Sequence, residues 1–218
     1  MLMNQQIEKF INQLKQRPDV LGVILFGSWA RGNNRPESDV DLVVIIDKGH
    51  KRAVENHGGY VFEIIYTTVK SAYRFWEENK DDAFNLWDIA KIVYDKTGVI
   101  KDLQAKTEQM LKSGKKVIDE SQLGQLHFDA EDQVEYSAQI YKQDPTTANM
   151  ILNNKVFVLT ELFFDIRQQW IPAPKQRIEV IKQAEPVLHL LLEEFNSTTS
   201  FERRIIIASK IIKLVFNK

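Results

Sequence analysis

Two aspartates separated by a single residue, Asp39 and Asp41, are well spaced to act together chemically. They stand at the start of the β-branched segment 40–46, which predicts a strand, so both side chains should point to one face. Their attachment points are then two strand rises apart, about 6.6 Å. Carboxylates at this spacing repel each other, and a hard divalent cation such as Mg²⁺ offsets that repulsion. Taken alone, such a pair is more often two solvated acids.

A glycine–serine pair, Gly27 and Ser28, follows an apolar segment that ends at residue 26. Glycine lets a backbone approach a phosphate closely, and the start of a helix, expected here at Trp29, favours an anion. Ser28 adds a hydroxyl donor. A plain strand-to-helix turn is the more common explanation of such a pair. The spacing of Gly27 and Gly32 is that of a Walker A loop, but Asn33 replaces its lysine, which excludes that loop.

One acid, Glu63, lies within the otherwise apolar segment 60–66. A buried carboxylate without a partner is costly, so Glu63 needs either water or a cation. Alternation puts it on the face of Val61 and Ile65. If this strand lies beside the strand that begins near Asp39, Glu63 becomes a third metal ligand. The alternative is a glutamate on an edge strand that faces water.

Hydrophobic periodicity predicts an α/β half followed by a helical half. The expected elements of the first half are a helix over residues 7–14, strands at 20–26, 40–46, 60–66 and 89–94, and a helix at 72–79. Beyond about residue 101 strand signals disappear. Apolar steps of four and three predict one buried helix face from Leu152 to Trp170, with Pro172 ending the helix. Further helices are expected at 178–181, 187–195 and 201–215.

The expected fold class is therefore α/β: an N-terminal domain at residues 1–115, with a mixed sheet flanked by helices, and an all-helical domain at 116–218. The 29 basic residues are offset by 30 acidic ones. A partner of long nucleic acid is not expected, because gripping it usually needs a basic excess. The sequence has no cysteine, no signal-peptide pattern and no apolar run of about 20 residues. These features predict a cytoplasmic protein without a membrane partner.

At the residues described above, the sequence resembles a known family. Phe-Gly-Ser at 26–28, followed after ten residues by Asp-Val-Asp-Leu at 39–42, is similar to the signature of the DNA polymerase β-type nucleotidyltransferase superfamily. The longer form, Gly-Ser-Trp-Ala-Arg-Gly at 27–32 with Ser-Asp-Val-Asp-Leu at 38–42, resembles its small bacterial branch. That branch includes minimal nucleotidyltransferases and enzymes that modify aminoglycosides and lincosamides. The motifs cover residues 20–66, and the segment 89–94 extends the resemblance weakly.

The resemblance implies an enzyme that moves a nucleoside monophosphate, AMP from ATP in the expected case, onto a hydroxyl of a small molecule such as an antibiotic. It implies release of pyrophosphate and two Mg²⁺ ions suited to in-line displacement. The implied catalytic and metal-binding acids are Asp39, Asp41 and Glu63. The implied nucleotide-binding residues are Gly27, Ser28 and Arg31. The family's third acid is often aspartate, so Glu63 departs from its usual pattern.

The helical half resembles the acceptor-side domain of antibiotic nucleotidyltransferases. Candidates there for a general base are Glu131, Glu135 and Glu161, and periodicity does not choose among them. The segment 163–175 is also similar to the tail of some uncharacterised bacterial nucleotidyltransferases, in which Lys175 would reach phosphate. A solvated lysine is the more common case. The four histidines lack metal-ligand spacing and receive no role, and the sequence leaves room for a homodimer.

Two other functions stay open. One is an antitoxin of the minimal-nucleotidyltransferase type, which nucleotidylates or binds a partner protein. Its partner toxins carry an Arg-x4-6-His motif, which Arg52 and His57 match formally. These two residues lie in an expected sheet hairpin rather than a helical bundle, so the match is interpreted as coincidence. The other is a degenerate nucleotide-binding module, which the presence of all three acids disfavours.

Overall fold

The structure is a computed structural model that describes residues 5–217. The chain divides into two compact units between Ser113 and Gly114. Gly114 has a φ of 69°, a left-handed backbone that glycine adopts without strain. Among the described residues, no helix has both the length and the apolar character that a membrane crossing requires.

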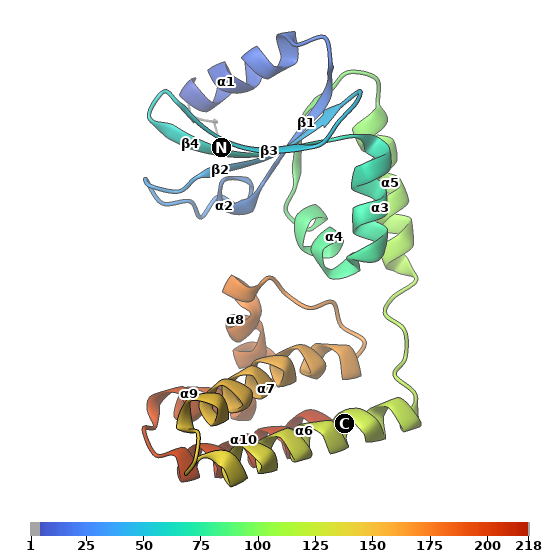
Figure 1. Ribbon diagram of the computed structural model, residues 1–218. Coiled ribbons are helices and arrows are strands. Elements are labelled where there is room, and N and C mark those ends of the chain that lie inside the picture. Colours follow the sequence, from blue (N-terminus) through green and yellow to red (C-terminus); the bar gives the residue numbers. More distant parts are fainter. Residues whose placement is uncertain (1–4, 218) are drawn as a thin grey trace. The chain divides into compact units, whose positions relative to one another are not determined.

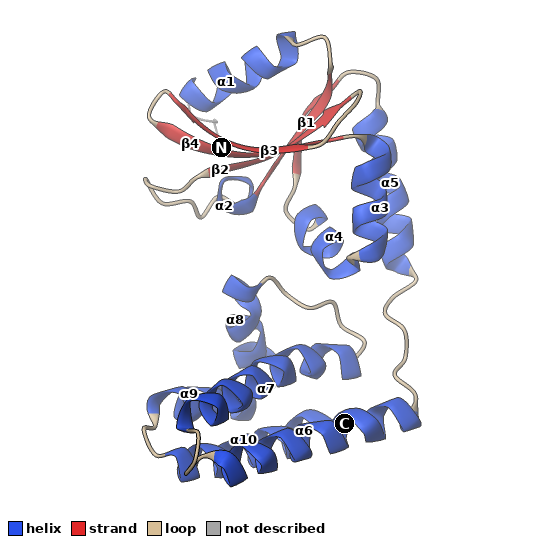
Figure 2. Ribbon diagram, in the orientation of Figure 1, coloured by secondary structure: helices blue, strands red, loops and turns tan. Residues whose placement is uncertain are grey.

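The N-terminal unit is built on one mixed sheet (Figures 1 and 2). Its elements are α1 (Gln5–Gln16), β1 (Val20–Phe26), α2 (Gly27–Arg31), β2 (Val40–Ile46), β3 (Lys51–His57), β4 (Tyr60–Thr67), α3 (Val69–Glu78), α4 (Lys80–Trp87), β5 (Lys91–Asp95) and α5 (Val99–Lys112). The strand order is β3-β4-β2-β1-β5, and only β2 and β4 are parallel among these neighbours. The predicted fold class is confirmed.

Each face of the sheet has its own apolar core. Along β2, Val40, Leu42 and Val44 face the helix α1, whose apolar residues recur at helical spacing. Val43 and Ile45 point the other way, onto α3, α4 and α5. Alternation therefore places an odd-numbered residue of β2, such as the one at position 41, on the α3–α5 side.

Three elements of this unit, β3, α4 and α5, were missing from the predicted helices and strands, although a sheet hairpin was expected around Arg52 and His57. The first is β3, an edge strand in which no described residue is fully buried, so it lacks apolar alternation. The second is α4, which begins where the predicted helix 72–79 should have ended. Its signal is the pair Ala83 and Trp87, four residues apart and both buried. The Trp87 ring packs edge-on against Trp76, with ring centroids 5.3 Å apart.

The C-terminal unit is entirely helical in its regular structure. It contains α6 (Glu120–Ile140), α7 (Pro145–Ile166), α8 (Pro174–Ala184), α9 (Pro186–Ser197) and α10 (Phe201–Phe216). The predicted buried face of α7 is confirmed from Leu152 to Ile166. The prediction is wrong at Trp170, which lies beyond the helix, because Gln168 adopts a left-handed φ of 56° and stops the helix before it.

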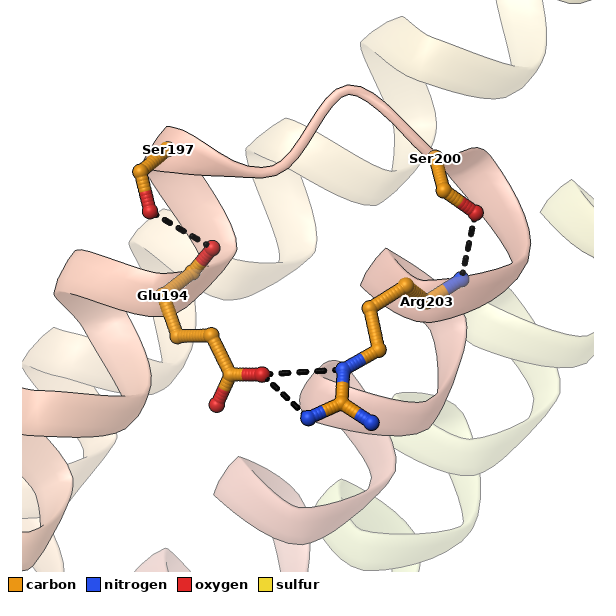
Figure 3. A network of polar contacts seen from close by, with 4 residues as sticks. All are labelled: Glu194, Ser197, Ser200 and Arg203. Atoms are coloured by element: carbon orange, nitrogen blue, oxygen red, sulfur yellow. Dashed lines mark hydrogen bonds and ion pairs between the residues drawn. The ribbon is translucent and has the colours of Figure 1, made fainter.

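The turn from α9 to α10 is fixed by the polar contacts drawn in Figure 3. Ser200 caps α10 by accepting a hydrogen bond from the backbone N–H of Arg203 at 3.2 Å. The Nε of Arg203 donates to the Glu194 carboxylate at 2.9 Å, and the Ser197 hydroxyl donates to the Glu194 carbonyl at 3.2 Å. Exposed ion pairs contribute at most about 1 kcal/mol, so this group sets the turn geometry more than the stability.

Candidate functional site

The three predicted acids lie together. Strands β2 and β4 are parallel neighbours, and their register pairs Asp41 with Glu63. Asp39 stands just before β2, two residues from Asp41. One carboxylate oxygen from each acid lies within 4.8 Å of the other two, and this is the one such cluster with metal-ligand spacing among residues 5–217.

The donor set suits a hard divalent cation. All three ligand groups are carboxylates, the type that Mg²⁺ accepts, and they come from two neighbouring strands. Asp39 and Asp41 are half-buried and Glu63 is exposed. Like charges about 4 Å apart repel by roughly 1 kcal/mol in water and roughly 4 kcal/mol near a protein surface. A cation between these side chains would turn that repulsion into attraction.

The indole of Trp29 contacts the segment that precedes Asp39. Trp29 in α2 donates from Nε1 to the carbonyl of Ser38 at 3.2 Å, and its ring packs edge-on against Tyr60 with centroids 5.7 Å apart. Ser38 also closes a turn with Arg35, whose backbone N–H donates to the Ser38 hydroxyl at 2.8 Å. The residue that precedes Asp39 is therefore fixed from two sides. Trp29 was not among the site residues predicted from the sequence.

Gly27 lies against the acids. Phe26, the last residue of β1, is in register with Asp41, and Gly27 follows it with a φ of 68°. A Cβ on Gly27 would lie 1.8 Å from Oδ2 of Asp41. The expected start of the helix at Trp29 is wrong by two residues, because α2 begins at Gly27 itself.

The hydroxyl of Ser28 is the second notable feature of this turn. Its Oγ is buried and has no hydrogen-bond partner among the described residues. An unsatisfied buried polar group costs about 1–3 kcal/mol, so a ligand that gave it a partner would recover that cost. Arg31 is exposed at the end of α2 and adds a positive charge to the same short helix.

A hollow of about 480 Å³ opens beside the acids. It is lined by Phe26, Asp41, Arg52, Ala53, Val54, Glu63, Ile64 and Ile65. Two of the three acids therefore face a space large enough for a small molecule or a side chain. Arg52 and His57, which match the toxin motif formally, lie on strand β3 and not in a helical bundle.

The candidate bases in the helical unit differ in their surroundings. Glu131 and Glu135 are exposed on α6. Glu161 on α7 accepts an ion pair from Nη1 of the buried Arg177 at 3.0 Å, so it has a structural partner. Lys175 is exposed near the start of α8.

A mixed sheet with a Gly-Ser turn after one strand, and carboxylates on two neighbouring strands, defines a nucleotidyltransferase type of site. The nucleotidyltransferase domain family matches residues 7–126, more than half of the chain, and the protein belongs to this family. The matched segment contains all six predicted site residues.

Two proteins of Methanocaldococcus jannaschii, each named "Putative protein adenylyltransferase", are similar to this chain. One is 39% identical over 70 residues, which is 30% of this chain and 48% of the relative. The other is 43% identical over 49 residues, 21% of this chain and 49% of the relative. The chain thus spans about half the length of the curated relatives it matches.

A solved structure shares the fold. The nucleotidyltransferase-like protein from Exiguobacterium sibiricum 255-15 superimposes with a TM-score of 0.53 and 13% identity, covering 97% of this chain and 73% of the other. At this identity the similarity concerns the fold alone.

Proposed function

We propose that the protein transfers a nucleoside monophosphate, AMP from ATP, to an acceptor hydroxyl in a Mg²⁺-dependent reaction that releases pyrophosphate. The observation that carries the proposal is the cluster of Asp39, Asp41 and Glu63, whose carboxylate oxygens lie within 4.8 Å of one another. Membership of the nucleotidyltransferase domain family supports the same reaction class.

The three carboxylates are the proposed ligands of two Mg²⁺ ions. When bound, such ions lower the pKa of an acceptor hydroxyl and offset the charge of the leaving pyrophosphate. The role of Gly27 is to let the backbone approach the triphosphate, since it has no side chain beside Asp41. The Ser28 hydroxyl is the proposed hydrogen-bond donor to a phosphate oxygen, and Arg31 adds positive charge.

The proposed step is an in-line displacement. The acceptor oxygen bonds to the α-phosphorus while the bond from that phosphorus to the bridging oxygen breaks. Pyrophosphate leaves with that oxygen, and the hydroxyl proton passes to solvent. Positioning and charge neutralisation supply most of the catalysis, so a separate general base is not required.

Two classes of acceptor are proposed. A hydroxyl on a small molecule, with antibiotics as the model case, fits the hollow of about 480 Å³ beside the acids. A hydroxyl on a protein is the second candidate, favoured by the names of the two Methanocaldococcus jannaschii relatives.

The test is release of pyrophosphate from ATP and Mg²⁺ with a panel of acceptors. The panel contains aminoglycosides, lincosamides and a set of folded proteins. Asp39→Asn and Asp41→Asn should each abolish turnover, whereas Asp47→Asn, an exposed aspartate just after β2, should leave it intact. Turnover that survives both site substitutions would exclude the assigned metal site.

A further inference from the structure

One face of the hairpin β3–β4 continues the surface that carries Glu63. The two strands are antiparallel, with Val54 opposite Glu63 and Arg52 opposite Ile65. Residues that are directly opposite in such a pair share a face of the sheet. Arg52 and Val54 therefore stand on the same side of the sheet as the metal-binding acids proposed above.

This part of the face is open. Val54 is 67% exposed and Val61, also on this face, is 40% exposed. Helices α3, α4 and α5 instead cover the part formed by Ile24, Val43 and Ile45. The sheet thus presents an apolar surface next to Glu63 that no described element of the N-terminal unit buries.

The hollow beside the acids is lined by charged residues of both signs. Arg52 is the one basic residue in its lining, and it has no hydrogen bond or ion pair from its guanidinium within residues 5–217. The acids that share the lining are Asp41 and Glu63. Once a divalent cation neutralises these acids, Arg52 remains as the charge that a ligand meets.

The strand order indicates which part of the proposed reaction would take place in the hollow. Gly27 and Ser28 follow β1, the acids belong to β2 and β4, and Arg52 lies on β3. The acids therefore stand between the Gly-Ser turn and β3. An in-line displacement needs the acceptor and the leaving pyrophosphate on opposite sides of the phosphorus. A triphosphate held at Gly27 and Ser28 leaves the β3 side for the acceptor.

We infer that the open β3–β4 face is the acceptor subsite, and that it selects a hydroxyl compound with an apolar body and an anionic group that pairs with Arg52. The inference rests on the proposed function. Arg52 stands one strand and two residues away from Glu63, about 8 Å between Cα atoms from strand spacing and rise. An acceptor that reaches both needs its hydroxyl and its carboxylate or phosphate at opposite ends. A polycationic aminoglycoside does not meet this requirement.

N-acetyltyrosine and its neutral amide are matched probes of this subsite. Both carry a hydroxyl at the end of an aromatic ring, and they differ in one carboxylate. Binding is followed by NMR, through the backbone amide signals of the whole protein in buffer that contains Mg²⁺. We expect N-acetyltyrosine to shift the signals of residues 52–54 and 61–65, and to bind roughly tenfold tighter than the amide, about 1.4 kcal/mol.

The matched variants are Arg52→Gln and Lys51→Gln. Both remove one positive charge from the same exposed strand, but Lys51 pairs with Tyr66 on the opposite face. The first should remove the preference for the carboxylate, and the second should retain it. Equal binding of the two probes to the unaltered protein, or shifts confined to other residues, would overturn the subsite.

Titration of the same protein with ATP and Mg²⁺ separates this inference from the proposed function. Shifts at Gly27 and Ser28 support the nucleotide site. One outcome is that ATP shifts no signal at Gly27 and Ser28 while N-acetyltyrosine still shifts residues 52–54 and 61–65 and binds tighter than its amide. In that case the proposed function fails and the anion-selective surface stands. If ATP binds and pyrophosphate is released while the probe preference is absent, the subsite fails and the proposed function stands.

Discussion

Gly27 lies so close to the carboxylate of Asp41 that position 27 has no room for a side chain. A Cβ at position 27 would lie 1.8 Å from Oδ2 of Asp41 and 2.7 Å from its Cγ. The close approach follows from the register of β1 and β2, which pairs Phe26 with Asp41. The Gly-Ser turn and the acidic pair are therefore parts of one packed arrangement.

Gly27→Ala should displace the Asp41 carboxylate and lower turnover roughly tenfold or more, since shifted ligands lose metal affinity. Gly49→Ala is the matched control, because Gly49 has a φ of 95° and open space around it. Both substitutions carry the left-handed backbone cost of about 1–2 kcal/mol. Mg²⁺ titration and pyrophosphate release would measure the difference. Equal behaviour of the two variants would show that the contact with Asp41 has no functional effect.

Asp39→Asn should raise the thermal stability of the metal-free protein slightly, because three mutually repelling carboxylates become two, and Asp41→Asn is measured beside it. The same variants should lose the stabilisation that Mg²⁺ gives to the unaltered protein. Melting curves with and without Mg²⁺ test both effects. A variant that is destabilised without metal and still stabilised by Mg²⁺ would contradict the assigned ligands.

Glu63→Gln should weaken turnover roughly tenfold or more while leaving the fold intact, since an exposed side chain loses a ligand charge but no packing. Glu55→Gln is the control on the neighbouring strand. Glu55 accepts a hydrogen bond from the Tyr66 hydroxyl at 3.4 Å on the opposite face of the sheet. Steady-state kinetics at saturating ATP measures the change. Unaltered activity in Glu63→Gln would remove this residue from the site.

Trp29→Phe should keep the aromatic contact with Tyr60 and lose the hydrogen bond to the Ser38 carbonyl. We expect a loss of about 1 kcal/mol in unfolding free energy. We also expect a weaker apparent affinity for Mg²⁺, because Ser38 directly precedes Asp39. Denaturant unfolding and a Mg²⁺ titration separate the two effects. A stability loss without any change in Mg²⁺ dependence would make Trp29 a purely structural residue.

Arg177→Met should destabilise the helical unit. Arg177 is 5% exposed, pairs with Glu161 and stacks over the Phe157 ring at 5.0 Å. Loss of a buried partner leaves a carboxylate unpaired and costs up to about 3–5 kcal/mol, less here because Glu161 is partly solvated. Lys175→Met, at an exposed position, is the control. Melting curves in which both variants unfold at the same temperature would contradict a stabilising role for the pair.

The sequence predicted those parts of the fold where apolar periodicity is strong. Strands β1 and β2 have the predicted bounds, and β4 differs by one residue. Placing Glu63 beside Asp41 needed only the condition that their strands be neighbours, which the structure meets. The edge strand β3 carries little apolar alternation, so the sequence indicated a hairpin around Arg52 and His57 but not the bounds of this strand.

Other features depend on contacts that no local pattern encodes. The hydrogen bond from Trp29 to Ser38 spans nine residues and joins a short helix to a turn. The close approach of Gly27 to Asp41 follows from strand register, which a motif spacing alone does not specify. The helix α7 stops before Trp170 although apolar spacing continues, because backbone conformation at Gln168 overrides the periodicity.

A crystal structure with Mg²⁺ and a non-hydrolysable ATP analogue would show whether the three acids bind the metal beside the Gly-Ser turn. We expect metal ions ligated by Asp39, Asp41 and Glu63, with the triphosphate against Gly27 and Ser28. A nucleotide bound elsewhere, or a triphosphate at the turn without any ion between the three carboxylates, would contradict this expectation.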